Sequence, residues 1–104
     1  MADKPYQLRY LPIFEQDLVE MVSYITNVLR NPDAANQLLA DVEAAIYERL
    51  ENPLFFEAYR SAGKRKHDYY RIYVRNYTVY YVVIDNVMEV RRFLYSARDV
   101  EKFL

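Results

Sequence analysis

The sequence predicts an α+β fold: an N-terminal strand, a helical hairpin packed on one face of a twisted antiparallel sheet, and a short C-terminal helix. A change of hydrophobic period carries this prediction. Apolar residues recur every three or four positions between residues 12 and 50, and every second position between 69 and 95. The chain has 104 residues, 53% of them hydrophobic, which is enough for one core. We therefore expect a single domain over residues 1–104.

The first elements follow from local pattern. Residues 6–10 alternate between apolar and polar side chains, which predicts a short half-buried strand ended by Pro12. A helix should follow, because one stripe then recurs at helical spacing. Its members are Phe14, Leu18, Met21, Val22, Ile25, Val28 and Leu29.

Asn31, Pro32 and Asp33 should end one helix and begin the next. Asn31 can cap the second helix, Pro32 suits its first position, and Asp33 favours its positive end. The second helix should stop near Pro53. Two helices joined by so short a connection form a helical hairpin.

The rest of the chain should form a loop, a meander and a tail. Residues 53–68 have no clean period, and three strands follow over 69–75, 77–84 and 87–95. Asn76 and the pair Asp85-Asn86 provide turns, where asparagine tolerates positive φ. In residues 96–104, Ser96 can cap a short helix that returns Val100, Phe103 and Leu104 to the core.

Alternation divides the strand residues between two faces. Tyr70, Ile72 and Val74 should face the helices, and Tyr69, Arg71, Tyr73 and Arg75 should lie on a partly open face. In the last strand, Met88, Val90, Arg92 and Leu94 should share one side, opposite Val87, Glu89, Arg91, Phe93 and Tyr95.

Composition excludes several classes of function. The chain has no cysteine and a single glycine, Gly63, so disulfide frameworks, thiolate metal sites and glycine-rich phosphate loops are not available. No stretch has the length of a signal peptide core or a membrane span. We expect a cytoplasmic protein with no cofactor, no metal and no membrane contact.

Charge is distributed unevenly. Residues 1–59 carry 4 Lys/Arg and 10 Asp/Glu (−6), and residues 60–104 carry 10 and 5 (+5), which gives the net −1. Such an asymmetry indicates either contact with a polyanion or attraction between the two parts of the fold.

The basic part suggests a candidate nucleic-acid surface. Arg71, Arg75 and Arg91, bordered by Lys64, Arg65 and Lys66, are residues that bind phosphates, and tyrosine rings can stack on bases. The alternative is that Tyr73, Tyr77, Tyr80 and Tyr81 are packing residues of a sheet. His67 is the one side chain suited to acid–base catalysis at neutral pH, although a lone loop histidine is more often inert.

Two segments, NPDAANQLLADVEAAIYERLENP and YYRIYVRNYTVYYVVIDNVMEVRRFLYSARD, make the chain resemble the RelE/ParE family, the toxins of bacterial type II toxin–antitoxin pairs. The resemblance implies a growth-inhibiting toxin that a cognate antitoxin protein neutralises. Its target is either ribosome-bound mRNA, cut by a RelE-like endoribonuclease, or DNA gyrase, inhibited by a ParE-like protein that is not an enzyme. A degenerate, non-toxic binding module is the third alternative.

The RelE pattern implies roles for particular residues. Arg71 and Arg98 would hold the phosphate, while Tyr73, Tyr95 or His67 would assist proton transfer. The pattern also expects basic residues where this chain has Tyr73 and Thr78, and a related group of the family has a terminal catalytic His-Tyr pair where this chain has Ser96-Ala97. A site of this kind depends on fixed cations, so these departures weigh against cleavage. The long hairpin favours the ParE-like branch, and Arg71 and Arg98 are shared with RelE-like members.

Overall fold

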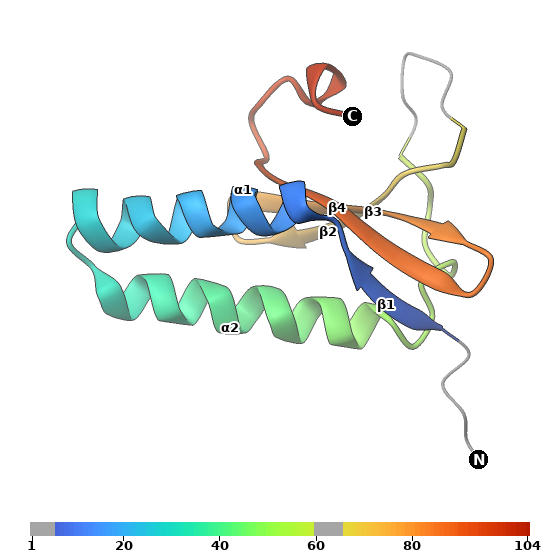
Figure 1. Cartoon of the computed structure of the whole chain (residues 1–104), viewed down its shortest axis with the longest axis horizontal. Helices are drawn as coiled ribbons and strands as arrows, with labels where there is room; N and C mark the ends of the chain where they lie inside the picture. Colours follow the sequence, from blue (N-terminus) through green and yellow to red (C-terminus); the bar gives the residue numbers. More distant parts are fainter. Residues whose placement is uncertain (1–5, 60–65) are drawn as a thin grey trace.

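The computed structural model describes residues 6–59 and 66–104, and it confirms the predicted α+β architecture (Figure 1). Helices α1 and α2 lie antiparallel along one face of the strands, and the turn that joins them projects beyond the sheet. The elements in chain order are β1 (Gln7–Tyr10), α1 (Pro12–Ser23), η1 (Tyr24–Val28), α2 (Pro32–Arg49), β2 (Tyr70–Val74), β3 (Tyr77–Ile84), β4 (Val87–Tyr95) and η2 (Val100–Lys102).

The sheet is mixed, whereas the sequence predicted an antiparallel one. Its strand order is β1-β4-β3-β2; β2, β3 and β4 form the expected antiparallel meander, and β1 pairs with β4 in parallel. Parallel pairing needs a long crossover connection. The helical hairpin and two strands separate β1 from β4 and provide one.

The second helix begins as predicted. The Asn31 side chain accepts a hydrogen bond from the backbone N–H of Ala34 (3.2 Å), Pro32 occupies the first position, and Asp33 lies in the first turn. Such a cap typically stabilises a helix by about 1 kcal/mol. Its apolar stripe, Ala35, Leu38, Val42 and Ile46, is buried against the sheet and α1.

The end of the first helix differs from the prediction. After Ser23 the helix continues as the π-helix η1, in which Leu29 N–H donates to the carbonyl of Tyr24 (3.1 Å). This end of the hairpin projects beyond the sheet (Figure 1), so side chains that follow Ile25 have no strand to pack against. Ile25 is buried, but Val28 and Leu29, expected in the buried stripe, are 63% and 55% exposed.

A β-bulge corrects the predicted faces of β4. Tyr80 pairs with Arg92 and Tyr81 pairs with Val90, so Arg91 is an extra residue in its strand. An extra residue reverses the alternation beyond it. Phe93 therefore joins Met88 and Val90 in the core beneath the helices, and Leu94 lies on the opposite face.

Both hairpin turns place positive φ on their first residue. Arg75 has φ 57° and Asp85 has φ 55°, whereas the sequence suggested that asparagine would adopt this conformation. The primed two-residue turns require a left-handed first position, because only then does the turn match the twist of the strands. At these two turns, the position of a residue in the turn therefore determines which residue adopts positive φ, and the preference of asparagine for that conformation does not.

The face opposite the helices is covered in part, which corrects the expectation of an open surface. Tyr69, Tyr80, Val82, Leu94 and Val100 form a second buried cluster. Phe103 and Leu104 pack against it, as predicted for the C-terminal segment. That segment is a single 3-10 turn that Ser96 does not cap. Tyr59, inside the predicted loop, makes an isolated bridge with Tyr69.

Candidate functional site

Arg71 of β2 lies on the second sheet face and has no ion pair among the described residues. Its guanidinium carbon lies 4.7 Å from the ring centroid of Tyr59 and 5.6 Å from that of Tyr73. Tyr73 is 64% exposed, in contrast to the buried Tyr80 and Tyr81 and the half-buried Tyr77, which are packing residues. We call Tyr59, Arg71 and Tyr73 the Arg71 cluster. It presents a guanidinium and an accessible ring, which together suit an anion or a planar group.

The Arg71 cluster is tied to the C-terminal segment through Tyr59. The Tyr59 hydroxyl donates a hydrogen bond to Glu101 Oε2 (2.6 Å). This bond, together with burial, raises the pKa of Tyr59 to about 12. A phenol with so high a pKa holds its proton near neutral pH and is a poor general base.

Titration tests the Tyr59–Glu101 bond. A difference ultraviolet titration between the wild type and Tyr59→Phe should show one phenol ionising near pH 12, and Glu101→Gln should lower that pKa toward 10. The folded pKa exceeds the unfolded value, so the bond's contribution to stability is complete below pH 10 and is lost as the pH rises to 12. Ionisation of this phenol near pH 10 in the wild type would show that the bond does not form in solution.

Arg98 lies apart from the Arg71 cluster. Its guanidinium carbon is 5.0 Å from the ring centroid of Phe103, and within residues 6–59 and 66–104 no ring that it contacts is one that Arg71 contacts. Arg98 and Tyr95 line a hollow of about 210 Å³. The other lining residues are Asp17, Glu20, Met21 and Tyr24 of the first helical segment, with Phe93 and Leu94. Glu20 disfavours a phosphate in this hollow, whereas the charge of Asp17 is compensated by Arg92.

Two further predicted phosphate ligands are engaged within the protein. Arg75 was expected on the open face, but its side chain turns to α2 and forms an ion pair with Asp41 (2.6 Å). Hydrogen bonds from Gln37 and then Arg75 lower the pKa of Asp41. Arg91 does lie on the predicted face, where it pairs with Glu89 (2.8 Å) and donates to the Tyr69 hydroxyl.

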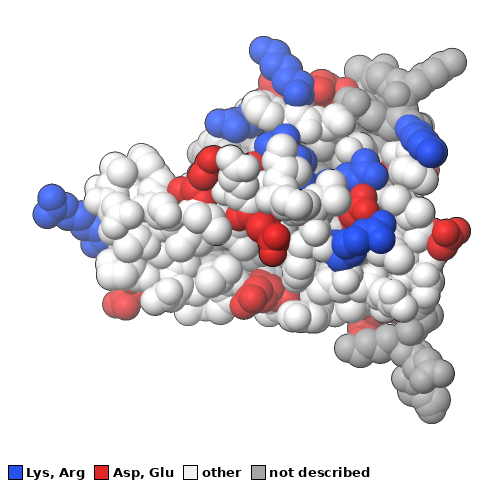
Figure 2. All heavy atoms as spheres, in the orientation of Figure 1, with Lys and Arg blue, Asp and Glu red and all other residues white. Residues whose placement is uncertain are grey.

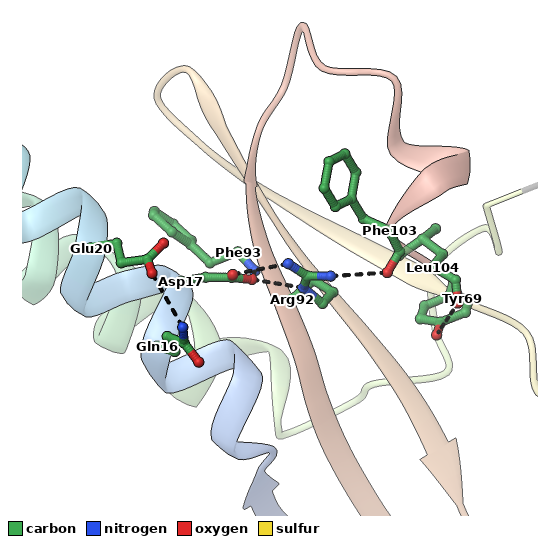
Figure 3. A network of polar contacts seen from close by, with 8 residues as sticks. All are labelled: Gln16, Asp17, Glu20, Tyr69, Arg92, Phe93, Phe103 and Leu104. Atoms are coloured by element: carbon green, nitrogen blue, oxygen red, sulfur yellow. Dashed lines mark hydrogen bonds and ion pairs between the residues drawn. The ribbon is translucent and has the colours of Figure 1, made fainter.

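Arg92 joins the two ends of the fold (Figure 3). Its Nε and Nη2 donate to the two carboxylate oxygens of Asp17 on α1 (2.8 and 3.0 Å), and Nη1 donates to the carbonyl of Phe103 (3.1 Å). Asp17 Oδ2 also accepts the backbone N–H of Phe93, on the part of β4 that β1 does not reach. The forked ion pair thus covers a free strand edge and anchors the C-terminal segment.

The remaining predicted residues provide little chemistry. Lys64 and Arg65 lie outside the described residues; Lys66 is exposed and His67 is half-buried in the bend that follows. Thr78, at a position where the resemblance expects a cation, is buried, and its Oγ1 lies 2.7 Å from Ser96 Oγ. A pair of neutral hydroxyls cannot replace a positive charge.

No continuous basic surface appears on the face drawn in Figure 2, where basic and acidic side chains lie next to one another over the strands. Within residues 6–59 and 66–104, no three His, Asp or Glu side chains are grouped so as to hold a metal ion. None of the helices described is both long and apolar enough to span a membrane.

Sequence reasoning missed an apolar projection between α2 and β2. Leu54, Phe55 and Phe56 are 51%, 83% and 47% exposed. The available signal was three consecutive large apolar residues in a segment without a period, a composition that is unusual for a solvated loop.

Comparisons with known proteins agree with the architecture. A model of the family described as ParE toxin of type II toxin-antitoxin system, parDE, matches residues 8–100. A search of curated protein sequences gives no match. Among solved structures, the chain is similar to one from the chromosomal ParDE TA system from P. aeruginosa, with a TM-score of 0.72 and 10% sequence identity. That match covers 89% of this chain and 98% of the other, and at this identity it supports the fold alone.

A helical hairpin on a small mixed sheet, matched over nearly the whole chain, defines the class: a toxin component of a type II toxin–antitoxin system. The chain belongs to the ParE toxin family.

Proposed function

We propose that this toxin arrests growth by binding DNA gyrase in the cytoplasm, and that it does not cut mRNA. The observation that carries the proposal is the dispersal of the arginines. Arg71 lies on aromatic rings on one part of the second face, Arg98 lies in a hollow that Glu20 also lines, and Arg75 and Arg91 are ion-paired. Phosphoryl transfer needs several cations converging on one phosphate, and this arrangement does not provide them.

One phenol of the Arg71 cluster is a poor candidate for proton transfer. Tyr59, the tyrosine nearest to Arg71, has a raised pKa and is bonded to Glu101. Thr78 replaces an expected cation. A protein that acts by binding needs neither a proton-transfer group nor a cation at position 78. A binding mechanism therefore requires fewer groups that are missing here than RNA cleavage does.

We also propose a cognate antitoxin as partner, since the solved structure similar to this chain is described as a ParDE TA system. The helical hairpin offers a surface for it. A hollow of about 120 Å³ between the helices has an apolar floor formed by Phe14, Leu18, Val42 and Ile46, with Glu15, Glu43 and Tyr10 among its lining residues. An amphipathic helix with basic residues at its edges would complement this groove.

Parallel measurements in cells and with purified gyrase test the mechanism. After brief induction without antitoxin, thymidine incorporation should fall before methionine incorporation, and the purified protein should inhibit supercoiling by gyrase without ribosomes. The double variant Arg71→Ala/Arg98→Ala should retain this inhibition within about tenfold, whereas loss of one electrostatic group from a nuclease site costs about 100- to 1,000-fold.

Either of two results would contradict the proposal. An earlier fall in methionine incorporation that Arg71→Ala abolishes would identify the Arg71 cluster as an RNA-cutting site. No fall in either incorporation, with the folded protein present at a normal level, would indicate the degenerate binding module.

A further inference from the structure

The segment after α2 presents apolar side chains to solvent in a fixed geometry. Phe55 is 83% exposed, the highest value among the large apolar side chains described, and Leu54 and Phe56 flank it. Burying one such side chain is worth about 1.5–3 kcal/mol, so leaving three in water forgoes a considerable stabilisation. We call residues Leu54, Phe55 and Phe56 the apolar knob.

Buried contacts hold the base of the knob. Pro53 is buried, and its carbonyl accepts a hydrogen bond from the hydroxyl of Tyr81 (2.6 Å), which is itself fully buried in β3. The same hydroxyl accepts from Arg49 Nη1 (2.9 Å). The chain then turns back through a bond from Phe55 N–H to the carbonyl of Asn52 (3.2 Å). The backbone at the base of the knob is therefore attached to the core at Pro53, and a local turn leads from it into the knob.

Arg49 also orders the rings. Its guanidinium carbon lies 3.5 Å from the ring centroid of Phe56, and Nη1 is fixed by the carbonyl of Arg71 and the hydroxyl of Tyr81. The ring of Phe56 in turn meets that of Phe55 edge to face, with centroids 6.1 Å apart. An aromatic side chain held in this way loses little conformational entropy on binding, which is typical of the anchor residues that dominate protein interfaces.

Charges around the knob select the class of partner. Glu48, Glu51 and Glu57 flank it in the chain; all three are exposed, and none has an ion pair among the described residues. The three carboxylates outnumber the one cation that the described residues place at the knob, Arg49 on the Phe56 ring, so the net charge there is negative and repels the phosphates of a nucleic acid. The carboxylates complement a protein pocket with an apolar floor and lysine or arginine at its rim.

We propose that the apolar knob is the contact by which this toxin holds its target protein, with Phe55 entering an apolar pocket whose basic rim faces Glu48, Glu51 and Glu57. The proposal rests on the proposed function, because it assumes a toxin that acts by binding. It assigns the target contact to the segment that follows α2, whose residues are different from those of the Arg71 cluster and from those that line the groove offered to the antitoxin.

The test compares two exposed apolar residues. Phe55→Ser should weaken binding of the full chain to purified gyrase by about tenfold or more, while Val19→Ser, at a 62% exposed position on α1, should bind as the wild type does. Both variants should keep the wild-type thermal unfolding midpoint, because both side chains are already in water. Glu51→Gln/Glu57→Gln should weaken binding and reduce its dependence on salt.

Binding and growth arrest together test the role of the knob separately from the identity of the target. Equal binding by Phe55→Ser and the wild type overturns the proposal, and so does a Phe55→Ser variant that loses only the antitoxin. If the wild type does not bind gyrase, gyrase is not the target, and the binding experiment does not test the role of the knob. Growth arrest by the same variants is therefore measured as well. Arrest lost with Phe55→Ser and kept with Val19→Ser then supports the knob against a different target protein, and arrest kept with both overturns it.

Discussion

Asp17→Ala is expected to lower the free energy of unfolding by about 3–5 kcal/mol, the usual cost of removing one partner from a buried ion pair. Side chains of Asp17 and Arg92 are only 12% and 14% exposed. The substitution leaves the Arg92 guanidinium without its anion and the Phe93 N–H without its acceptor. Domains of this size commonly have 5–15 kcal/mol of stability in total.

Urea unfolding followed by circular dichroism would measure the loss, which should lower the thermal midpoint by about 12 °C or more. Glu20→Ala is the matched control: Glu20 lies one turn further along α1, is exposed, and accepts a hydrogen bond from the exposed Gln16 (3.2 Å). It should change stability by less than about 0.5 kcal/mol. A similar loss in both variants would show that the Asp17 fork has no special contribution.

Glu89→Gln is expected to cost about 1.5–3 kcal/mol at pH 7, the contribution of hydrogen bonds to a charged group. The Glu89 side chain is 8% exposed and lies between Arg9 (2.6 Å) and Arg91 (2.8 Å). The expected cost is smaller than for Asp17, because the Arg9 side chain is 51% exposed and can be solvated once its partner is neutral.

The pH dependence of stability separates this ion-pair effect from simple loss of packing. Burial alone would raise the pKa of Glu89, but hydrogen bonds from Arg91 and Arg9 outweigh it and keep the pKa below its usual value. The contribution is therefore present above the unfolded pKa and lost as the pH falls through the folded one. Wild-type stability should fall in acid more steeply than that of Glu89→Gln. Parallel acid curves for the two proteins would contradict the assignment.

The elements that could be predicted from the sequence depend on local interactions. Asn31 caps α2 through a bond to a residue three positions away, and the period-two pattern identifies β2, β3 and β4. The bulge at Arg91 could not be read in this way, because alternation shows that a strand exists but not that one residue in it is unpaired. The parallel pairing of β1 is likewise a contact between distant residues.

The candidate site was less predictable for the same reason. Strand alternation placed Arg71 on the face opposite the helices, where the structure has it. The partner of Arg75 is Asp41 on α2 and that of Arg92 is Asp17 on α1, and no local pattern specifies which carboxylate a long arginine reaches. Internal attraction between the acidic hairpin and the basic strands, one of the two readings of the charge asymmetry, accounts for these two arginines.

The parallel pairing of β1 with β4 has a consequence for synthesis of the chain. Gln7 is in register with Val87, 80 residues later, so the first strand has no partner until the last one has left the ribosome. Contacts between such distant residues form slowly, because a large loop must close first. Until then the backbone of the nascent first strand is open to pairing with other chains. Completion of the sheet is thus delayed until β4 has been synthesised.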